Sequence, residues 1–280
     1  MSLRDMGKGL FHNPDFDPDR FAADMEKRAA ARTLGILFTP RSGSSWLTDV
    51  LTQTRLFGKP QEWFNPNFMG NTLKRVNANS PQGYIDMLRR KHSLGNFFSF
   101  EVTIYQMHRV FGKDPGLMAY LPEKFPLIYL RRQDMVLQAV SLAKAVQTDV
   151  FHTVNTTPEE IASAEARFEY DGDQIRQWLE HIFDQERKCE AFLADREGPL
   201  LRITYEQMMR AGAEQTVRRF LRRWRPLKAD DPLTFEPRHA KIGSARNKTF
   251  AQRFRDENPG VMAEIAAFRE DVRASIAGAG

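Results

Sequence analysis

The sequence has little of what marks secreted, membrane or nucleic-acid-binding proteins. It holds one cysteine, Cys189, which cannot form an internal disulfide, and its net charge of +5 is small for 280 residues. It contains no apolar run of about eighteen residues and no secretory signal segment, so we expect no stable membrane insertion. These absences predict a protein of the reducing cytoplasm that needs no nucleic-acid partner.

Signatures of metal sites and of serine hydrolases are also missing. None of the six histidines stands in an H-x-x-x-H or H-E-x-x-H pattern, from which we expect no metal site. No serine lies in a G-x-S-x-G motif, which counts against a Ser-His-Asp hydrolase. The composition, 41% hydrophobic and 28% charged, is that of a globular enzyme with a substantial core.

Predicted strands and helices alternate along the chain. Strands are expected at 33–39, 96–105, 125–131 and 199–205. Helices are expected at 19–32, 47–54, 81–93, 134–148, 214–225 and 259–275, with two more inside 158–196. The stretch 65–80 and the tail from 230 to 259 are predicted to be irregular. This alternation predicts an α/β fold with a parallel sheet covered on both faces and ligands at the carboxyl ends of its strands.

The domain organisation follows from the same pattern. We expect an N-terminal arm with a helix at 1–32, followed by one domain at 33–280 that carries a helical insert at about 158–196. No internal repeat or low-complexity linker divides the chain.

The segment 40–46, Pro-Arg-Ser-Gly-Ser-Ser-Trp, joins a predicted strand to a predicted helix. Such a turn directs unpaired backbone N–H groups and the positive end of a helix dipole to one point, which favours a bound anion. Arg41 can bond two oxygens, Gly43 allows close approach of the backbone, and the three serines supply hydroxyl donors and a helix cap. The alternative is a serine-rich turn that only caps an ordinary helix.

This loop is not the P-loop of ATPases and GTPases. That motif needs Lys followed by Ser or Thr after its second glycine, whereas Gly43 is followed by Ser-Ser-Trp. The predicted ligand is therefore a molecule that carries a phosphate or sulfate group and is not Mg-ATP. Trp46 could stack on adenine, and a core position is an equal alternative.

Three further segments carry candidate functional residues. Glu62 lies 21 residues after Arg41 and could act as a general base, with a solvated turn residue as the alternative. Arg132 leaves a predicted strand and Ser141 follows nine residues later, so the two can hold a second phosphate; a capped helix with surface arginines is the alternative. Basic residues also gather in the tail 238–248, where they could close over an anion or stay solvated.

Three stretches together resemble one enzyme family. They are Arg-Ser-Gly-Ser at 41–44, Gly-x-Pro-Gln-Glu-x-Phe at 58–64 and Gln-Ala-Val-Ser-Leu-Ala-Lys-Ala-Val-Gln-Thr at 138–148. They are similar to stretches of the bacterial Stf0-type, trehalose 2-sulfotransferase-like family, with weaker similarity at 204–206 and 246–255. The resemblance implies a P-loop-like three-layer fold with a central parallel sheet flanked by helices. It also implies a donor substrate, 3′-phosphoadenosine 5′-phosphosulfate (PAPS), a bisphosphate product, PAP, and no metal.

The resemblance also implies roles for individual residues. The cradle of the 5′-phosphosulfate would be Arg41, Ser42, Gly43, Ser44 and Ser45, next to Trp46. Arg132 and Ser141 would hold the 3′-phosphate, and Arg246 would contact the donor from a lid. Glu62 would be the catalytic base, and Arg41 would stabilise charge on the departing phosphate. The acceptor, a hydroxyl of a carbohydrate, glycolipid or other small molecule, would lie near Lys59, Gln61, Trp63 and Phe64.

Two positions depart from the family pattern. Lys59 stands where the trehalose enzyme has an acidic residue near its sugar, which counts against trehalose as the acceptor. Glu101 stands on a predicted strand where many sulfotransferases carry a lysine, so charge on the leaving group must be stabilised by Arg41 or elsewhere.

Two other functions are also compatible with the sequence. One is a nucleotide-dependent phosphotransferase of the P-loop kinase type, against which the missing Lys-Ser/Thr pair counts. The other is a non-catalytic nucleotide- or RNA-binding module that uses the basic helix at 214–225. A homodimer is compatible with the sequence.

Overall fold

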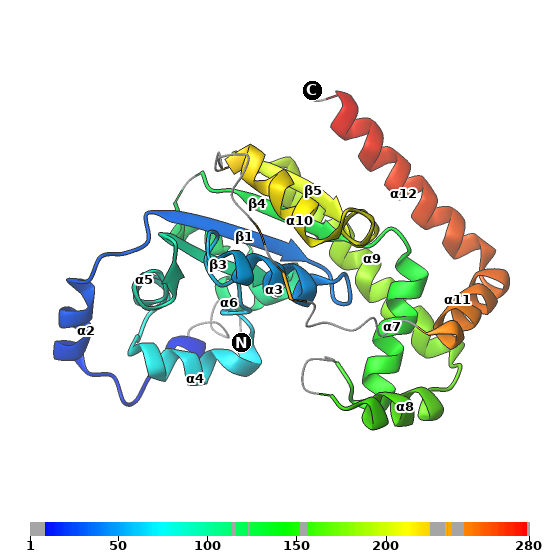
Figure 1. Cartoon of the computed structure of the whole chain (residues 1–280), viewed down its shortest axis with the longest axis horizontal. Coiled ribbons are helices and arrows are strands. Elements are labelled where there is room, and N and C mark those ends of the chain that lie inside the picture. Colours follow the sequence, from blue (N-terminus) through cyan, green and yellow to red (C-terminus); the bar gives the residue numbers. More distant parts are fainter. Residues whose placement is uncertain are drawn as a thin grey trace. The chain divides into compact units, whose positions relative to one another are not determined.

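The computed structural model describes residues 9–113, 116–122, 124–151, 156–224, 233, 235–236 and 244–278. It contains a five-stranded sheet in the order β2-β3-β1-β4-β5 (Figure 1). The strands are β1 Arg32–Phe38, β2 Ser93–Leu94, β3 Phe97–Val102, β4 Leu127–Arg131 and β5 Leu200–Thr204. All neighbouring strands pair in parallel except β2, which is antiparallel to β3. The predicted α/β class with a mostly parallel central sheet is confirmed.

Helices connect and cover the strands. Their bounds are η1 Gly9–Phe11, α2 Pro18–Met25, α3 Ser44–Thr54, α4 Pro66–Val76, α5 Pro81–Lys91, α6 Ile104–Phe111, η2 Gly116–Tyr120, α7 Met135–Thr148, α8 Pro158–Arg167, α9 Gly172–Ala194, α10 Tyr205–Trp224, α11 Ala245–Glu257 and α12 Pro259–Gly278. The two helices expected inside 158–196 are present as α8 and α9. α10 begins earlier than predicted and is kinked at Gly212, where φ is 73° and ψ is 176°.

The prediction of irregular structure is wrong for α4 and α11. Each of these helices starts at a polar side chain that caps it: Asn65 accepts a hydrogen bond from Asn67 N, and Ser244 accepts one from Asn247 N. Such caps satisfy N–H groups that a helix otherwise leaves unpaired. Residues 225–232 and 237–243, with much of the basic tail expected to close over an anion, lie outside the described residues.

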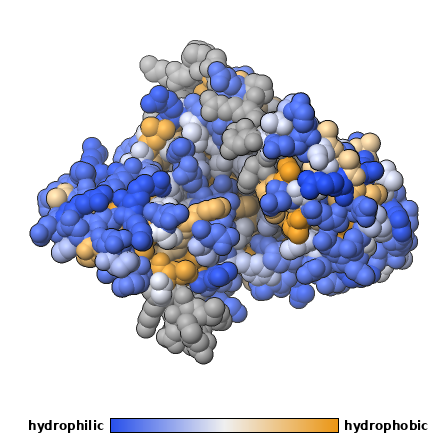
Figure 2. Space-filling model, turned by 90° about the horizontal axis from the view of Figure 1, so that it is seen from below, coloured by the Kyte–Doolittle hydropathy of each residue, from blue (hydrophilic) through white to orange (hydrophobic). Residues whose placement is uncertain are grey.

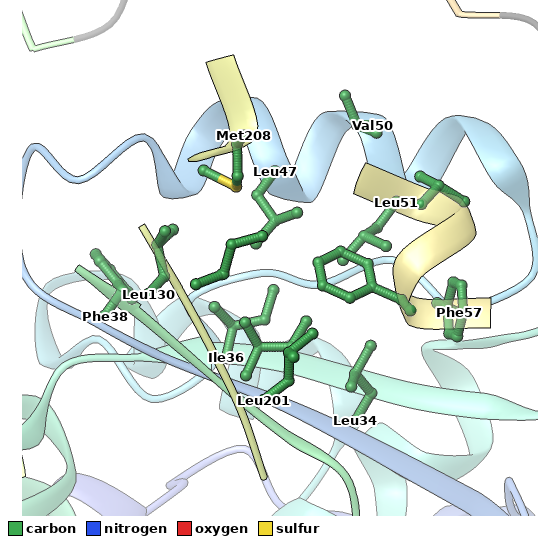
Figure 3. Packing of buried hydrophobic residues seen from close by; sticks show 14 of the residues in the cluster. Leu34, Ile36, Phe38, Leu47, Val50, Leu51, Phe57, Leu130, Leu201 and Met208 are labelled. Atoms are coloured by element: carbon green, nitrogen blue, oxygen red, sulfur yellow. The ribbon is translucent and has the colours of Figure 1, made fainter. Parts of the chain in front are cut away.

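One face of the sheet is covered by α3 and α10. Alternate residues of β1, including Leu34 and Ile36, point to this face and pack against Leu47 and Leu51 of α3 and Met208 of α10 (Figure 3). Burying each such side chain contributes on the order of 1.5–3 kcal/mol. This packing holds α3, and with it the loop that precedes α3, against the sheet.

The opposite face carries an aromatic cluster. Gly35 of β1 makes room for it, since a Cβ at this position would lie 2.9 Å from the Phe100 ring. The Phe64 ring lies 5.3 Å from that of Phe100, and it also contacts Tyr84 of α5 and Phe111 of α6. Because helices cover both faces, the expected three-layer arrangement is present.

The chain divides into two compact units. The first comprises Met1–Arg131 and Arg196–Glu236 and holds the sheet, while the second comprises Arg132–Asp195 and Pro237–Gly280. In the second unit, α7 contacts α8, α9 and α11 around a core that includes Ala139, Leu179 and Phe254. The division into an arm at 1–32 and one domain at 33–280 with an insert at 158–196 stays a prediction.

The surface is mainly hydrophilic. On the face shown in Figure 2, hydrophobic residues form small, separate patches. Among the described residues, the exposed large hydrophobic side chains are Phe68, Val146, Phe151 and Met209. No helix in the described ranges is long and apolar enough to cross a membrane.

Candidate active site

The loop at 39–43 connects β1 to α3, in the order of strand, loop and helix predicted from the sequence. Arg41 and Gly43 both have left-handed backbone conformations, with φ of 63° and 88°. Gly43 is the N-cap residue of α3, and its carbonyl accepts a hydrogen bond from Leu47 N at 3.1 Å. A side chain cannot be accommodated at position 43, because a Cβ would lie 2.6 Å from Cδ2 of Tyr205. The start of α10 therefore fixes the shape of this loop.

The serines of the loop do not cap α3. Gly43 occupies the N-cap position, and no side chain of the described residues caps the helix there, so the expected serine cap is wrong. Ser42 is fully buried, and its Oγ has no hydrogen-bond partner within the described part of the chain. A buried hydroxyl without a partner costs about 1–3 kcal/mol, which a bound anion would offset. Trp46 packs partly buried against the α3 core, so its stacking on adenine stays a prediction.

Glu62 is held in place by two amide side chains. Its Oε2 accepts a hydrogen bond from Asn65 Nδ2 at 2.8 Å and another from Gln106 Nε2 at 2.5 Å. Gln106 belongs to the capping box of α6, where its Oε1 accepts a hydrogen bond from Thr103 N at 2.9 Å. Since the capping box fixes which end of the amide faces Glu62, the carboxylate receives a donor of defined direction.

A second carboxyl group, Glu101, lies beside Glu62 and the loop. Glu101 is the penultimate residue of β3, is only 7% exposed, and its backbone N donates to Gln61 O at 3.0 Å. The pKa of Glu101 is raised to about 8, mainly by burial and then by the negative charge of Glu62, and an interaction with the Ser44 hydroxyl partly opposes both. Sequence reasoning noted Glu101 only as a departure from the family pattern.

The four predicted acceptor residues differ in their surroundings. Lys59 is exposed. The pKa of His92 is lowered mainly by the burial of His92, and the positive charges of Arg75 and Lys59 lower it further. Gln61 forms an isolated parallel bridge to β3. Trp63 and Phe64 are 5% and 0% exposed, and the Trp63 indole donates to Ser99 O at 3.0 Å. The contacts of both rings are those of core residues, and their role toward an acceptor stays a prediction.

The second unit holds the predicted 3′-phosphate residues. Arg132 and Ser141 are half-buried, the first just before α7 and the second within it. α7 begins at Asp134, whose carboxylate accepts from Leu137 N at 2.9 Å and from Arg255 Nη2 at 2.6 Å. A capped helix, as in the alternative interpretation, is thus present, and the phosphate role of Arg132 stays a prediction.

Arg269 of α12 supports the backbone just before α7, and the sequence analysis did not identify this residue. Its guanidinium donates to the backbone carbonyls of Arg132, at 2.7 Å, and of Gln133. The same guanidinium pairs with Glu186 of α9 at 2.7 Å, where the two side chains are 11% and 0% exposed. A buried ion pair of this kind fixes the backbone from which the Arg132 side chain extends.

Arg246 lies on α11 and contacts the end of α8. Its guanidinium donates to the carbonyls of Glu165 and Ala166, and to that of Phe168 at 3.1 Å. Cations at a helix C-terminus satisfy carbonyls that lack intrahelical partners. The contact of Arg246 with a donor molecule stays a prediction.

The first unit therefore combines a strand-loop-helix turn that could hold an anion with a carboxylate that two amides fix in place. Such an arrangement can hold a charged group and can remove a proton from a hydroxyl that attacks this group. No group of three or more His, Cys, Asp or Glu side chains in the ranges that the structure describes could hold a metal ion.

Comparison with protein families identifies a relationship for this chain. A family model described as Stf0 sulphotransferase matches residues 117–257, about half of the chain. The matched range runs from η2 to α11 and contains Arg132 and Ser141, whereas the loop at 39–43, Glu62 and Arg269 lie outside it. No curated protein matches the chain.

Proposed function

Because the chain belongs to the Stf0 sulphotransferase family, it is a sulfotransferase, and we propose that it transfers the sulfuryl group of PAPS to a hydroxyl group. The proposed acceptor is a carbohydrate, a glycolipid or another small molecule. The observation that supports an anionic donor is the buried Ser42 hydroxyl, which has no partner among the described residues and precedes the N-terminus of α3, where no side chain of the described residues caps the helix.

The residues of the loop fit a phosphosulfate group. Arg41 offers a planar cation, Gly43 keeps the backbone clear of side chains, and the start of α3 offers N–H groups and the positive end of the helix dipole. Ser42, Ser44 and Ser45 add hydroxyl donors. Arg132 and Ser141 of the second unit are the proposed ligands of the 3′-phosphate, with Arg246 as a further contact.

When bound, PAPS supplies a sulfur that bonds to the acceptor oxygen as its bond to the phosphate oxygen breaks. Glu62 takes the proton of the acceptor hydroxyl, and the amides of Asn65 and Gln106 keep its carboxylate in position. Arg41 and the N–H groups of α3 stabilise the charge that grows on the phosphate. No step in this proposal uses a metal.

The proposal places the enzyme in the cytoplasm, where a thiol such as that of the buried Cys189, which forms no disulfide, stays reduced. Lys59 is exposed and lies close to Glu62 in the sequence, so we favour an anionic or neutral acceptor over a cationic one. Nucleic acid and membrane lipid are not among the proposed partners, and a homodimer is compatible with the proposal.

Thermal denaturation with a panel of nucleotides tests the donor. A ligand that binds only the folded state raises its stability by about 2.7 kcal/mol at one hundred times its dissociation constant. PAP should raise the midpoint more than ADP or Mg-ATP, and 5′-AMP serves as the matched control that lacks the 3′-phosphate.

The other functions predict different results in the same experiment. A kinase-type phosphotransferase would respond most to Mg-ATP. An RNA-binding module would show salt-dependent RNA binding and no preference for PAP. Equal shifts for PAP and 5′-AMP would remove Arg132 and Ser141 from the donor site.

A further inference from the structure

We propose that Glu101 is a positioning residue of the donor site: as a protonated carboxyl it donates its hydrogen to Ser44 Oγ and thereby directs the Ser44 hydroxyl to the bound anion. This inference rests on the proposed function, because the anion is taken to be the 5′-phosphosulfate of PAPS or the 5′-phosphate of PAP.

The register of β3 places Glu101 on the same side of the sheet as α3. Phe97, Ser99 and Glu101 alternate along the strand, and Phe97 belongs to the core that α3 covers. Across the sheet, Glu101 stands opposite the fully buried Ile36 of β1. Its Oε2 has no hydrogen-bond partner among the residues that the structure describes. A carboxyl in these surroundings has little water to stabilise a charge.

The groups that face Glu101 together favour its neutral form, although the Ser44 hydroxyl by itself favours the ionised form. From α3 comes the Ser44 hydroxyl, from the segment before α4 comes the ionisable Glu62, and from β1 comes an apolar side chain. Burial and the charge of Glu62 raise the pKa of Glu101 to about 8, so the group carries its proton at neutral pH. An anion bound at the loop adds a further negative charge nearby and strengthens this preference.

The state of Glu101 then determines whether the Ser44 hydroxyl can donate a hydrogen bond to the anion. A serine hydroxyl has one hydrogen and can donate it once. An ionised Glu101 can only accept, so it takes that hydrogen away from the ligand. A protonated Glu101 donates instead, which frees the Ser44 hydrogen for an oxygen of the anion. Ionisation of Glu101 therefore removes a donor from the site and adds a repulsive charge to it.

The test measures PAP affinity by titration calorimetry at about pH 7 and about pH 9. If binding requires protonated Glu101, wild-type affinity falls by about tenfold over this range, because a group with a pKa of about 8 must regain its proton. In Glu101→Gln the amide donates to Ser44 Oγ at every pH, so the fall should shrink to less than about twofold. Glu101→Leu has no donor and should bind PAP more weakly than Glu101→Gln at both pH values.

Glu180→Gln is the matched control, since Glu180 is an exposed residue of α9. This variant should keep the wild-type pH dependence. The same pH dependence in wild type and Glu101→Gln would overturn the inference while leaving PAP binding, and so the proposed function, intact. Absence of PAP binding by the wild type at both pH values would instead overturn the proposed function and the inference with it.

A measurement on the wild type alone covers the case in which the variants do not fold. Infrared titration distinguishes a protonated carboxyl from a carboxylate. A protonated carboxyl band that persists at neutral pH and disappears near pH 8 supports the inference, because surface carboxyls ionise near pH 4. Absence of that band at neutral pH overturns it.

Discussion

Gln106 Nε2 lies 2.5 Å from Oε2 of Glu62, and this amide links the capping box of α6 to the proposed catalytic base. The hydrogen bond joins residues 44 positions apart in the sequence. One side chain thus both starts a helix and orients a carboxylate. A change at Gln106 should therefore affect turnover as well as stability.

We expect Gln106→Leu to lower kcat by about tenfold to a hundredfold, because a hydrogen bond to a charged group is worth about 1.5–3 kcal/mol. The dissociation constant of PAP should stay within about twofold of wild type, since Glu62 acts on the acceptor. Gln106→Glu is not a useful substitute, because it would place a second negative charge against Glu62. Labelled-sulfate transfer from PAPS to an acceptor found by screening gives kcat, and unchanged turnover would contradict the role of Gln106.

Glu62→Gln should bind PAP and lower turnover by about two to four orders of magnitude, the usual contribution of a general base. The substitution keeps the size and the hydrogen-bonding shape of the side chain and removes its basicity. Single-turnover transfer of labelled sulfate measures the effect, with Glu180→Gln as the exposed control. Near-normal turnover would exclude Glu62 as the base.

Gly43→Ala should destabilise the first unit and weaken PAP binding. A left-handed backbone costs a non-glycine residue about 1–2 kcal/mol, and a Cβ at 2.6 Å from Tyr205 adds a clash. Urea denaturation should show a loss of about 2–4 kcal/mol. Gly70→Ala is the control, because a Cβ at Gly70 would meet no atom within 4 Å outside its own stretch of helix, and a helix favours alanine. Equal effects of the two substitutions would refute the proposed shape of the loop.

Arg269→Met should lower the free energy of unfolding by about 3–5 kcal/mol, since it leaves the buried Glu186 without this cation. The double variant Arg269→Met/Glu186→Leu should regain much of the stability, because no charge is then buried. It should not regain PAP affinity, because the bonds to the carbonyls of Arg132 and Gln133 stay absent.

Lys124→Met provides the comparison for that pair of variants. Lys124 and Glu197 form an exposed ion pair at 3.1 Å, and its loss should change stability by less than about 1 kcal/mol. Recovery of both stability and PAP affinity in the double variant would show that Arg269 acts only through the ion pair.

Glu101 should also make stability depend on pH. Its carboxyl has an ordinary pKa of 4.5 when unfolded and about 8 when folded, so the folded state binds more protons between these values. Stability therefore falls as pH rises through this window. Glu101→Gln should remove this loss, which amounts to at most about 1.4 kcal/mol for each pH unit. Urea denaturation at several pH values measures the difference, and parallel curves for both proteins would contradict it.

The sequence predicted the parts of the fold that depend on local pattern. The apolar run of β1 followed by Arg41 and Gly43 was enough to predict strand, loop and helix, because backbone geometry and dipole act within a few residues. α4 was missed because Asn65 and Pro66 were interpreted as a turn, although the same pair is a helix start. The Thr103-x-x-Gln106 capping box was visible in the sequence and would have pointed to Gln106.

The remaining features depend on contacts between distant parts of the chain. Arg269 and Arg132 are 137 residues apart, and no local pattern indicates that one binds the backbone of the other. The burial of Glu101 follows from the packing of α3 on the sheet, which sequence alone does not give. For Trp63 and Phe64 the motif position suggests an acceptor contact, and the structure adds that both rings are buried, which sequence alone could not decide.

The position of Arg269 on α12 also limits how this protein can be shortened. A fragment that ends at Glu257 would keep the whole range matched by the family model and lose the cation that neutralises Glu186. Expression of such a fragment should give a poorly folded or aggregating product, although every recognised residue is retained. On this expectation, the segment needed for a stable fold extends at least one helix beyond the range that the family model matches.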